Sequence, residues 1–231
     1  MITDCFAASS FHDPAHNSDL HGVSPHFILI VGQLMILAEE RRMEYRTFLD
    51  FMDLAEKLKC RTRHSLTSSG RTESVAEHCW RMTLMAFLLK DEFPDIHIEK
   101  VMSMALIHDL GEAVTGDIPA FSKTEEDEKV EDKAVEHILE QLPDTQRCEM
   151  SALFDEMKAM ETDEAKLYKS LDKLEALIQH NEADLSTWLP LEYDLQMTYG
   201  TQECGFSSYM KGLRDTVRED SVRKIEAAKE D

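Results

Sequence analysis

Apolar residues recur every three or four positions along most of the chain, and this spacing predicts a succession of helices. The expected helices span roughly 27–40, 44–59, 73–91, 97–109, 124–141, 145–160, 162–182 and 203–228. No segment has a convincing alternation of apolar and polar residues, so we expect no strand. The pattern therefore predicts an all-α helical bundle.

The periodicity also divides the chain. Residues 1–25 have little of it, and a regular helical pattern begins at Met43. We expect an N-terminal extension over 1–42, partly disordered and with one candidate helix, followed by the main folded domain over 43–231. The extension contains a His12-Asp13 pair, but no apolar helix accompanies it, so we expect no function there.

Composition narrows the possible partners. With 42% hydrophobic and 31% charged residues, the 231-residue chain has the balance of a soluble globular domain. Its net charge of −21 argues against nucleic acid as a partner, because phosphates attract basic surfaces. To bind a phosphorylated compound, so negative a protein would need a local positive charge from a metal ion or an arginine.

Cysteine usage and hydropathy indicate a cytoplasmic location. The five cysteines are scattered and never form a C-x-x-C pair, which favours a reducing compartment. The apolar stretch from Phe27 to Ala38 is shorter than the roughly 20 residues that cross a bilayer, and it lacks a basic leader. We expect neither a membrane partner nor a signal peptide.

Titratable residues interrupt two of the apolar faces. His78 shares a helical stripe with Val75 and Met82, although a lone histidine there is more often a hydrogen-bonded core residue. Another apolar run ends in His108-Asp109, two positions before Gly111, where a helix-end cap is an alternative explanation. Burying such groups unpaired costs roughly 2–7 kcal/mol, and a divalent cation would offset this cost.

A fourth candidate ligand is Asp172, on the shoulder of the stripe that contains Leu171 and Leu174. An acidic residue in that position is usually only solvated. The ordered set of two histidines and two aspartates is more informative than any member. Imidazole and carboxylate groups together suit Co, Mn, Fe or Zn better than Mg.

Two segments, 71–78 (RTESVAEH) and 108–119 (HDLGEAVTGDIP), resemble the HD-domain metal-dependent phosphohydrolases, and most closely the 5′-deoxynucleotidase subgroup. The resemblance covers about residues 44–200. It implies an HD-domain helical bundle with a central metal site, hydrolysis of nucleoside 5′-monophosphates and a homodimer. It also implies one divalent metal ion held by His78, His108, Asp109 and Asp172.

The same resemblance assigns roles to two further residues, Arg63 and His64, and a mechanism based on it gives roles to Glu112 and Asp117. Arg63 matches an arginine that meets phosphate, and His64 stands where the subgroup has a tryptophan near the sugar, so selection for deoxyribose is expected to relax. Glu112 is the expected catalytic residue, which orients or deprotonates the attacking water. Asp117 is expected to accept a hydrogen bond from a sugar hydroxyl, although an aspartate here could simply form a turn.

Three alternatives remain open. A two-metal HD enzyme needs extra histidines, but only His137 lies between Asp109 and Asp172. A deoxynucleoside triphosphate triphosphohydrolase would use the same ligands. A non-catalytic helical adaptor could present the acidic segment 125–140 to a partner, but it would not need both the ligand set and Glu112.

Overall fold

The structure is a computed structural model, and it describes residues 43–230. The expected helix at 27–40 and the His12-Asp13 pair lie outside these residues. The prediction of an all-α fold is confirmed. The longer helices are α2 (Tyr45–Cys60), α3 (Val75–Leu88), α4 (Ile98–Ile107), α6 (Glu125–Leu139), α7 (Asp144–Ala159), α8 (Asp163–Glu182) and α11 (Ser208–Glu230). The shorter ones are α5 (Glu112–Thr115), α9 (Pro190–Thr198), α10 (Thr201–Cys204) and the 3-10 turns η1 (Lys90–Glu92) and η2 (Leu185–Thr187).

The expectation of no strand is wrong at one place. Strands β1 (Thr62–Leu66) and β2 (Thr72–Ser74) form an antiparallel hairpin between α2 and α3. The turn is closed by the Thr67 N–H, which donates to the Arg71 carbonyl at 2.7 Å, and it contains Gly70 at a φ of +80°. Arg63 of this hairpin lines the candidate site described below. Because a charged side chain occupies an inward-facing position of the strand, the sequence lacks the simple alternation of apolar and polar residues that marks a half-exposed strand.

The region after α8 also differs from expectation, because the structure places α9 and α10 before the final helix. Pro190 is the first residue of α9, where its missing N–H costs nothing and its fixed φ suits the helix. Gly200, at a φ of +74°, then separates α9 from α10. Pro190 therefore begins a helix in a region where the sequence pattern predicted none.

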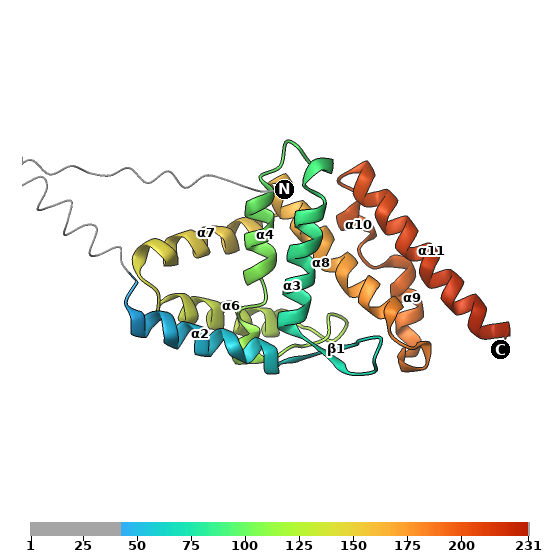
Figure 1. Cartoon of the computed structure of the whole chain (residues 1–231), viewed down its shortest axis with the longest axis horizontal. Helices are drawn as coiled ribbons and strands as arrows, with labels where there is room; N and C mark the ends of the chain where they lie inside the picture. Colours follow the sequence, from blue (N-terminus) through green and yellow to red (C-terminus); the bar gives the residue numbers. More distant parts are fainter. Residues whose placement is uncertain (1–42, 231) are drawn as a thin grey trace, which may run out of the picture. The chain divides into compact units, whose positions relative to one another are not determined.

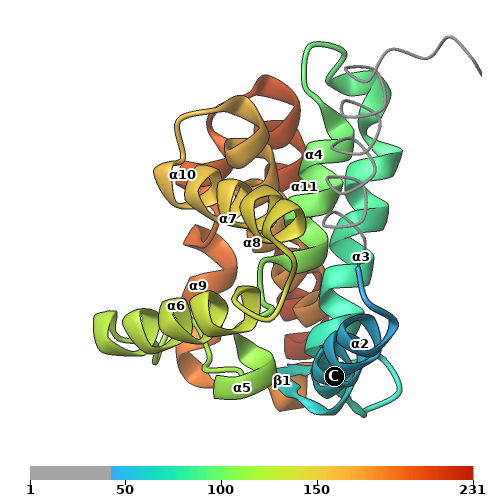
Figure 2. The same cartoon turned by 90° about the vertical axis from the view of Figure 1, so that its left-hand side faces the viewer.

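Helix α8 lies at the centre of the bundle, with α3 and α4 on one side and α10 and α11 on the other (Figure 1). The main core includes Met82 of α3, Val101 and Met104 of α4, and Leu171 and Leu174 of α8, all fully buried. A second apolar cluster joins α2, α5, α6 and the first turns of α3. Figure 2 shows α2 and α5 beside β1 of the hairpin. The backbones of α3, α4 and α8 are therefore held close together, which positions the polar side chains they carry.

Within residues 43–230, no helix combines the length and the hydropathy that a membrane crossing requires.

Candidate functional site

The first component of the site is His78, one turn into α3. The helix begins with a capping box: Glu77 N–H donates to the Ser74 hydroxyl, and Ser74 N–H donates to the Glu77 carboxylate. This fixes the first turn, and Val75 and Met82 bury the same face. His78 is fully buried, and its Nε2 lies 3.4 Å from Asp172 Oδ1 and 4.0 Å from Asp109 Oδ2.

The second component is the His108-Asp109 pair at the end of α4. The His108 Nδ1–H donates to the carbonyl of Ala105 at 3.0 Å, which leaves the Nε2 atom with a free lone pair. That Nε2 lies 3.1 Å from Asp109 Oδ2 and 4.0 Å from Asp172 Oδ1. The pair therefore faces His78 and Asp172 and does more than cap a helix end.

Asp172, on α8, completes the group. Its Oδ2 accepts a hydrogen bond from Lys169 Nζ at 2.8 Å, and its Oδ1 lies 3.4 Å from His78 Nε2 and 4.0 Å from His108 Nε2. Burial by itself would raise the pKa of Asp172, but the charge of Lys169 and the contact with His78 hold that pKa well below its ordinary value. Asp172 is thus ionised at neutral pH.

The four side chains fit a divalent cation. The Nε2 atoms of His78 and His108 are buried, and neither has a hydrogen-bond partner among the described residues. Ligand atoms of His78, His108 and Asp109 all lie within 4.8 Å of one another, and Asp172 Oδ1 reaches both imidazoles. Two orphaned nitrogen lone pairs facing two carboxylates form a donor set for a transition metal ion.

Glu175 is part of the site but was not predicted from the sequence. Its carboxylate accepts a hydrogen bond from the His78 Nδ1–H, which directs Nε2 towards the aspartates. Arg81 balances the buried charge, with its Nε 3.2 Å from Glu175 Oε1. The sequence feature that could have identified Glu175 is its three-residue spacing from Asp172, which places both carboxylates on one face of α8.

Glu112 lies at the start of α5, beside Asp109. It is 4% exposed, and its Oε2 has no hydrogen-bond partner among residues 43–230. Burial, followed by the charges of Asp109, Asp117 and Glu131, raises the pKa of Glu112 to about 9. The carboxyl group is therefore poised to exchange a proton if a positive charge offsets these neighbours.

Arg63 and His64 are adjacent on β1. Arg63 Nε lies 3.2 Å from Glu73 Oε2, and its NH1 lies 3.7 Å from Asp109 Oδ2. Burial opposes the charged form, but the nearby carboxylates raise the pKa of Arg63, so it stays a cation. His64 Nε2 lies 3.0 Å from Glu192 Oε1 of α9.

Two neighbouring cavities are lined by these residues. The site cavity, of about 300 Å³, is lined by His108, Asp109, Asp172 and Glu112 among others. The adjoining cavity, of about 230 Å³, contains His64 but none of these four residues. Five residues line both cavities: Arg63, Asp117, Ala120, Ala176 and Tyr199. The two cavities are therefore adjacent and share part of their walls.

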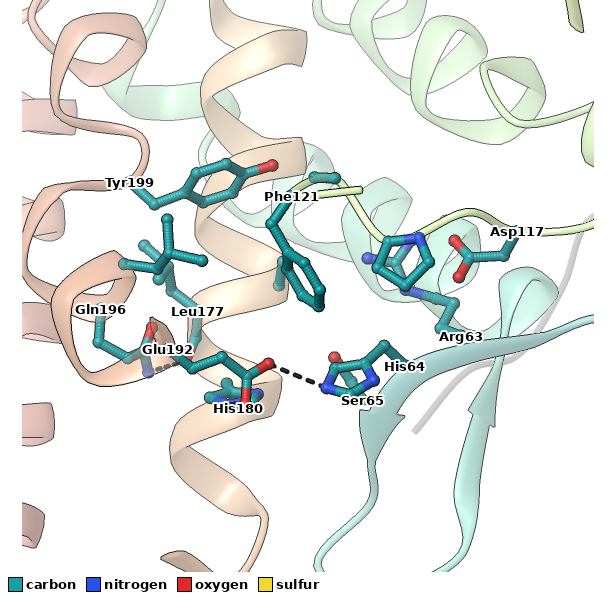
Figure 3. Close-up of a pocket in the computed structure, with 14 residues that line it drawn as sticks. Arg63, His64, Ser65, Asp117, Phe121, Leu177, His180, Glu192, Gln196 and Tyr199 are labelled. Carbon is teal, nitrogen blue, oxygen red and sulfur yellow. Dashed lines mark hydrogen bonds and ion pairs between the residues drawn. The ribbon is translucent and has the colours of Figure 1, made fainter. Parts of the chain in front are cut away.

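The walls of the adjoining cavity suit a flat, partly apolar group. Figure 3 shows Phe121 pointing into it, with Leu177 and Tyr199 on one side and His64 on the other. Phe121 contacts the His64 ring edge-on, at a centroid distance of 5.5 Å. Asp117 lies where the two cavities meet, and burial raises its pKa.

Comparisons with known proteins agree with this geometry. A family model described as an HD domain matches residues 55–213. A Danio rerio protein named 5′-deoxynucleotidase HDDC2 is 36% identical over 188 residues, which cover 79% of this chain and 92% of the relative. A Schizosaccharomyces pombe protein named 5′-deoxynucleotidase hdd1 is 32% identical over 160 residues, covering 62% of this chain and 80% of that protein.

A solved structure extends the agreement to the fold. The crystal structure of a predicted metal-dependent phosphohydrolase from Magnetospirillum magnetotacticum MS-1 superposes with a TM-score of 0.67 at 30% identity, covering 81% of this chain and 95% of the other. These findings confirm the resemblance seen in the sequence. The chain therefore belongs to the HD-domain family of metal-dependent phosphohydrolases, in the group that contains the 5′-deoxynucleotidases.

Proposed function

We propose that the protein is a metal-dependent phosphomonoester hydrolase that releases phosphate from nucleoside or deoxynucleoside 5′-monophosphates. The observation that carries this proposal is the convergence of two orphaned imidazole nitrogens and two carboxylates beside one cavity, which His108, Asp109 and Asp172 line. That cavity adjoins a second one with space for a nucleoside. Relatives from fish and yeast that carry the name 5′-deoxynucleotidase support the choice of substrate.

His78, His108, Asp109 and Asp172 are the proposed ligands of one divalent ion. Bound there, such an ion would polarise a phosphoryl oxygen and lower the pKa of a water molecule. The mixture of nitrogen and oxygen donors favours Co, Mn, Fe or Zn over Mg. Glu175 fixes the His78 tautomer, and the Ala105 carbonyl does the same for His108.

Arg63 and Glu112 are proposed to act on the reacting groups. The guanidinium of Arg63 lies at the rim of both cavities, where it can donate to a phosphate oxygen. Glu112 is the proposed general base for the attacking water. For this role Glu112 must be ionised. Burial is the main cause of its raised pKa, and among the negative neighbours that raise it further, Asp109 is a proposed ligand whose charge a bound cation would offset.

His64 and Asp117 are proposed to contact the sugar. Asp117 lies at the junction of the cavities, where the sugar of a nucleotide bridging them would pass. His64 is held by Glu192, and an imidazole edge can hydrogen-bond a 2′-hydroxyl. We therefore propose that ribonucleotides are accepted together with deoxyribonucleotides.

We also propose that the protein is a cytoplasmic homodimer. On α3, four large apolar side chains are exposed and share one face: Trp80, Leu84, Phe87 and Leu88. A contiguous exposed patch of this kind supports a protein contact. The cysteines of residues 43–230 are all free thiols, which supports a reducing compartment. Light scattering of the purified protein would give the number of subunits.

A phosphate-release panel tests the activity. Ribo- and deoxyribonucleoside mono-, di- and triphosphates would be incubated with the metal-free protein and with added Co, Mn, Mg, Zn or Ni. We expect orthophosphate from the monophosphates with Co or Mn. Tripolyphosphate from triphosphates, without action on monophosphates, would instead indicate a triphosphohydrolase. Inactivity towards every nucleotide with every metal would favour the adaptor.

A further inference from the structure

Lys173 of α8 lines the site cavity but has no role in the proposal above. It follows Asp172 directly in the sequence, and its side chain is 15% exposed. The Nζ atom donates a hydrogen bond to the hydroxyl of Tyr199 at 2.7 Å and lies 4.5 Å from the centre of that ring. A mostly buried ammonium group is costly unless charged or polar partners surround it, so its presence in a cavity wall calls for an explanation.

The surrounding structure holds Lys173 in place. Gly200, next to Tyr199, approaches so closely that a Cβ atom there would lie 2.9 Å from Lys173 Cβ. Behind Tyr199, the buried Arg214 donates from Nε to the Tyr199 carbonyl at 2.7 Å and from NH2 to the Gln196 carbonyl at 2.9 Å. The turn between α9 and α10 is thus fitted around the lysine stem, and the ammonium has a fixed position.

Charge balance within the protein does not account for Lys173. Four cationic side chains line the site cavity: Arg63, Lys123, Lys169 and Lys173. The first three each have a carboxylate oxygen within 3.2 Å, from Glu73, Glu131 and Asp172 respectively. For Lys173, the Asp172 Oδ2 at 3.9 Å is beyond hydrogen-bond distance, and that oxygen already accepts from Lys169. Its nearest partner is the neutral hydroxyl of Tyr199.

The charges around Arg63, which lines the same cavity, also call for a second cation. Arg63 lies between Glu73 and Asp109, so two carboxylates compete for its single charge. A phosphate monoester carries up to two negative charges, and Arg63 alone cannot balance them. Lys173 is on α8 and Arg63 is on β1, so the two cations can approach a phosphoryl group from different elements.

We propose that Lys173, positioned by Tyr199, is a second phosphate-binding residue that contacts a non-bridging oxygen of the substrate phosphoryl group. This inference rests on the proposed phosphohydrolase activity. A lysine binds phosphate as a compact point charge, and it complements the planar fork of Arg63. Tyr199 is a positioning residue in this scheme, because it acts on the phosphate through the lysine.

The test uses the full chain loaded with Mn²⁺ or Co²⁺ and four variants. Lys173→Met removes the charge and keeps the length of the side chain, Lys173→Arg keeps the charge, and Tyr199→Phe removes the hydroxyl that holds the ammonium. Lys166→Met is the matched control, because Lys166 is on the same helix, does not line either cavity and pairs with Asp163. Inorganic phosphate affinity is measured by calorimetry, metal content by elemental analysis, and KM and kcat with nucleoside monophosphates.

We expect Lys173→Met to weaken phosphate binding about tenfold or more, since it removes a hydrogen bond to a charged group. Its KM should rise similarly, with metal content unchanged. Lys173→Arg should retain most of the affinity, and Tyr199→Phe should raise KM more than it lowers kcat. Lys166→Met should match the wild type.

Two results would overturn this proposal: phosphate affinity of Lys173→Met within twofold of the wild type at equal metal content, or no phosphate binding by the metal-loaded wild type. A protein that binds phosphate through Lys173 but cleaves no nucleotide would refute the proposed function and leave the lysine assignment standing. The two failures are therefore distinguishable.

Discussion

The carboxylate of Glu175 on α8 accepts a hydrogen bond from Nδ1–H of His78 on α3, and both side chains are completely buried. The imidazole therefore cannot turn without breaking a charge-assisted hydrogen bond in the core. The contact also fixes the tautomer in which Nε2 carries the lone pair. Nε2, the atom proposed to bind the metal, is thus oriented by a residue that contacts the other nitrogen of the same ring.

This relationship predicts the effect of Glu175→Gln. An amide in place of the carboxylate weakens the hydrogen bond to His78 and leaves Arg81 without its buried carboxylate partner. We expect metal affinity to fall about 10–100-fold, as is typical when the partner of a metal-binding histidine is changed. Titration of the metal-free protein by calorimetry would measure this change. Glu182→Gln is the control, because Glu182 is also paired with Arg81 but lies near the surface; equal metal affinities in the two variants would contradict the role of Glu175.

A second prediction separates chemistry from metal binding at Glu112. Glu112→Gln should retain the metal while kcat falls roughly 100-fold or more, which is the usual contribution of a general base. Asp109→Asn should lose metal and activity together. Glu128→Gln, which alters another carboxylate of the same cavity, should have little effect on kcat. Normal turnover by Glu112→Gln would show that a different group accepts the proton.

A third prediction concerns sugar selection at His64. We expect His64→Trp to increase the preference for deoxyribonucleotides, because an indole would fill the space near a 2′-hydroxyl and remove the imidazole edge. The measurement is kcat/KM for matched ribo- and deoxyribonucleoside monophosphates. Ser65→Ala, on the same strand and beside the same cavity, is the control. An unchanged ratio in His64→Trp would place the sugar away from this residue.

A fourth prediction concerns the pH dependence of stability. The hydrogen bond from Arg71, together with those from Ser74, lowers the pKa of Glu77 to about 2. A carboxyl group whose pKa is lowered by folding stabilises the protein above its unfolded pKa of about 4.5, and this contribution is lost as the pH falls towards the folded value. The melting temperatures of the wild type and Glu77→Gln should therefore differ by a constant amount above about pH 6 and converge between about pH 5 and pH 2. A difference that grows on acidification would contradict this assignment.

The sequence predicted most helices and all four candidate ligands, because both depend on local patterns. His78 and His108 interrupt apolar stripes, and the spacing of such stripes follows from helix geometry alone. The hairpin was not predicted, because its short strands, with Arg63 in a cavity wall, lack the alternation that marks a strand. Helices α9 and α10 were missed because Pro190 marks a helix start as readily as a connection.

The supporting residues could not be predicted for a different reason. Glu175, Lys173 and Tyr199 become meaningful only through contacts with residues distant in the sequence. Glu175 is 97 residues from His78, and Tyr199 is 26 residues from Lys173. On a helix pattern alone, Glu175 resembles any solvated carboxylate and Lys173 any surface lysine. Tertiary packing, which periodicity does not encode, turns them into parts of the site.

Helix α8 carries residues of both cavities and so fixes the distance between them. Asp172 is a proposed ligand of the ion and lines the site cavity, whereas Leu177 and His180 line only the adjoining cavity. Eight residues of helix separate Asp172 from His180, a rise of about 12 Å that cannot stretch without breaking the helix. The length of a substrate that spans both cavities is therefore set by the helix backbone. Mutation can alter the wall of the adjoining cavity without disturbing the proposed metal ligands. Relatives that share this helix can therefore differ in the bases they accept while the chemistry near Asp172 stays the same.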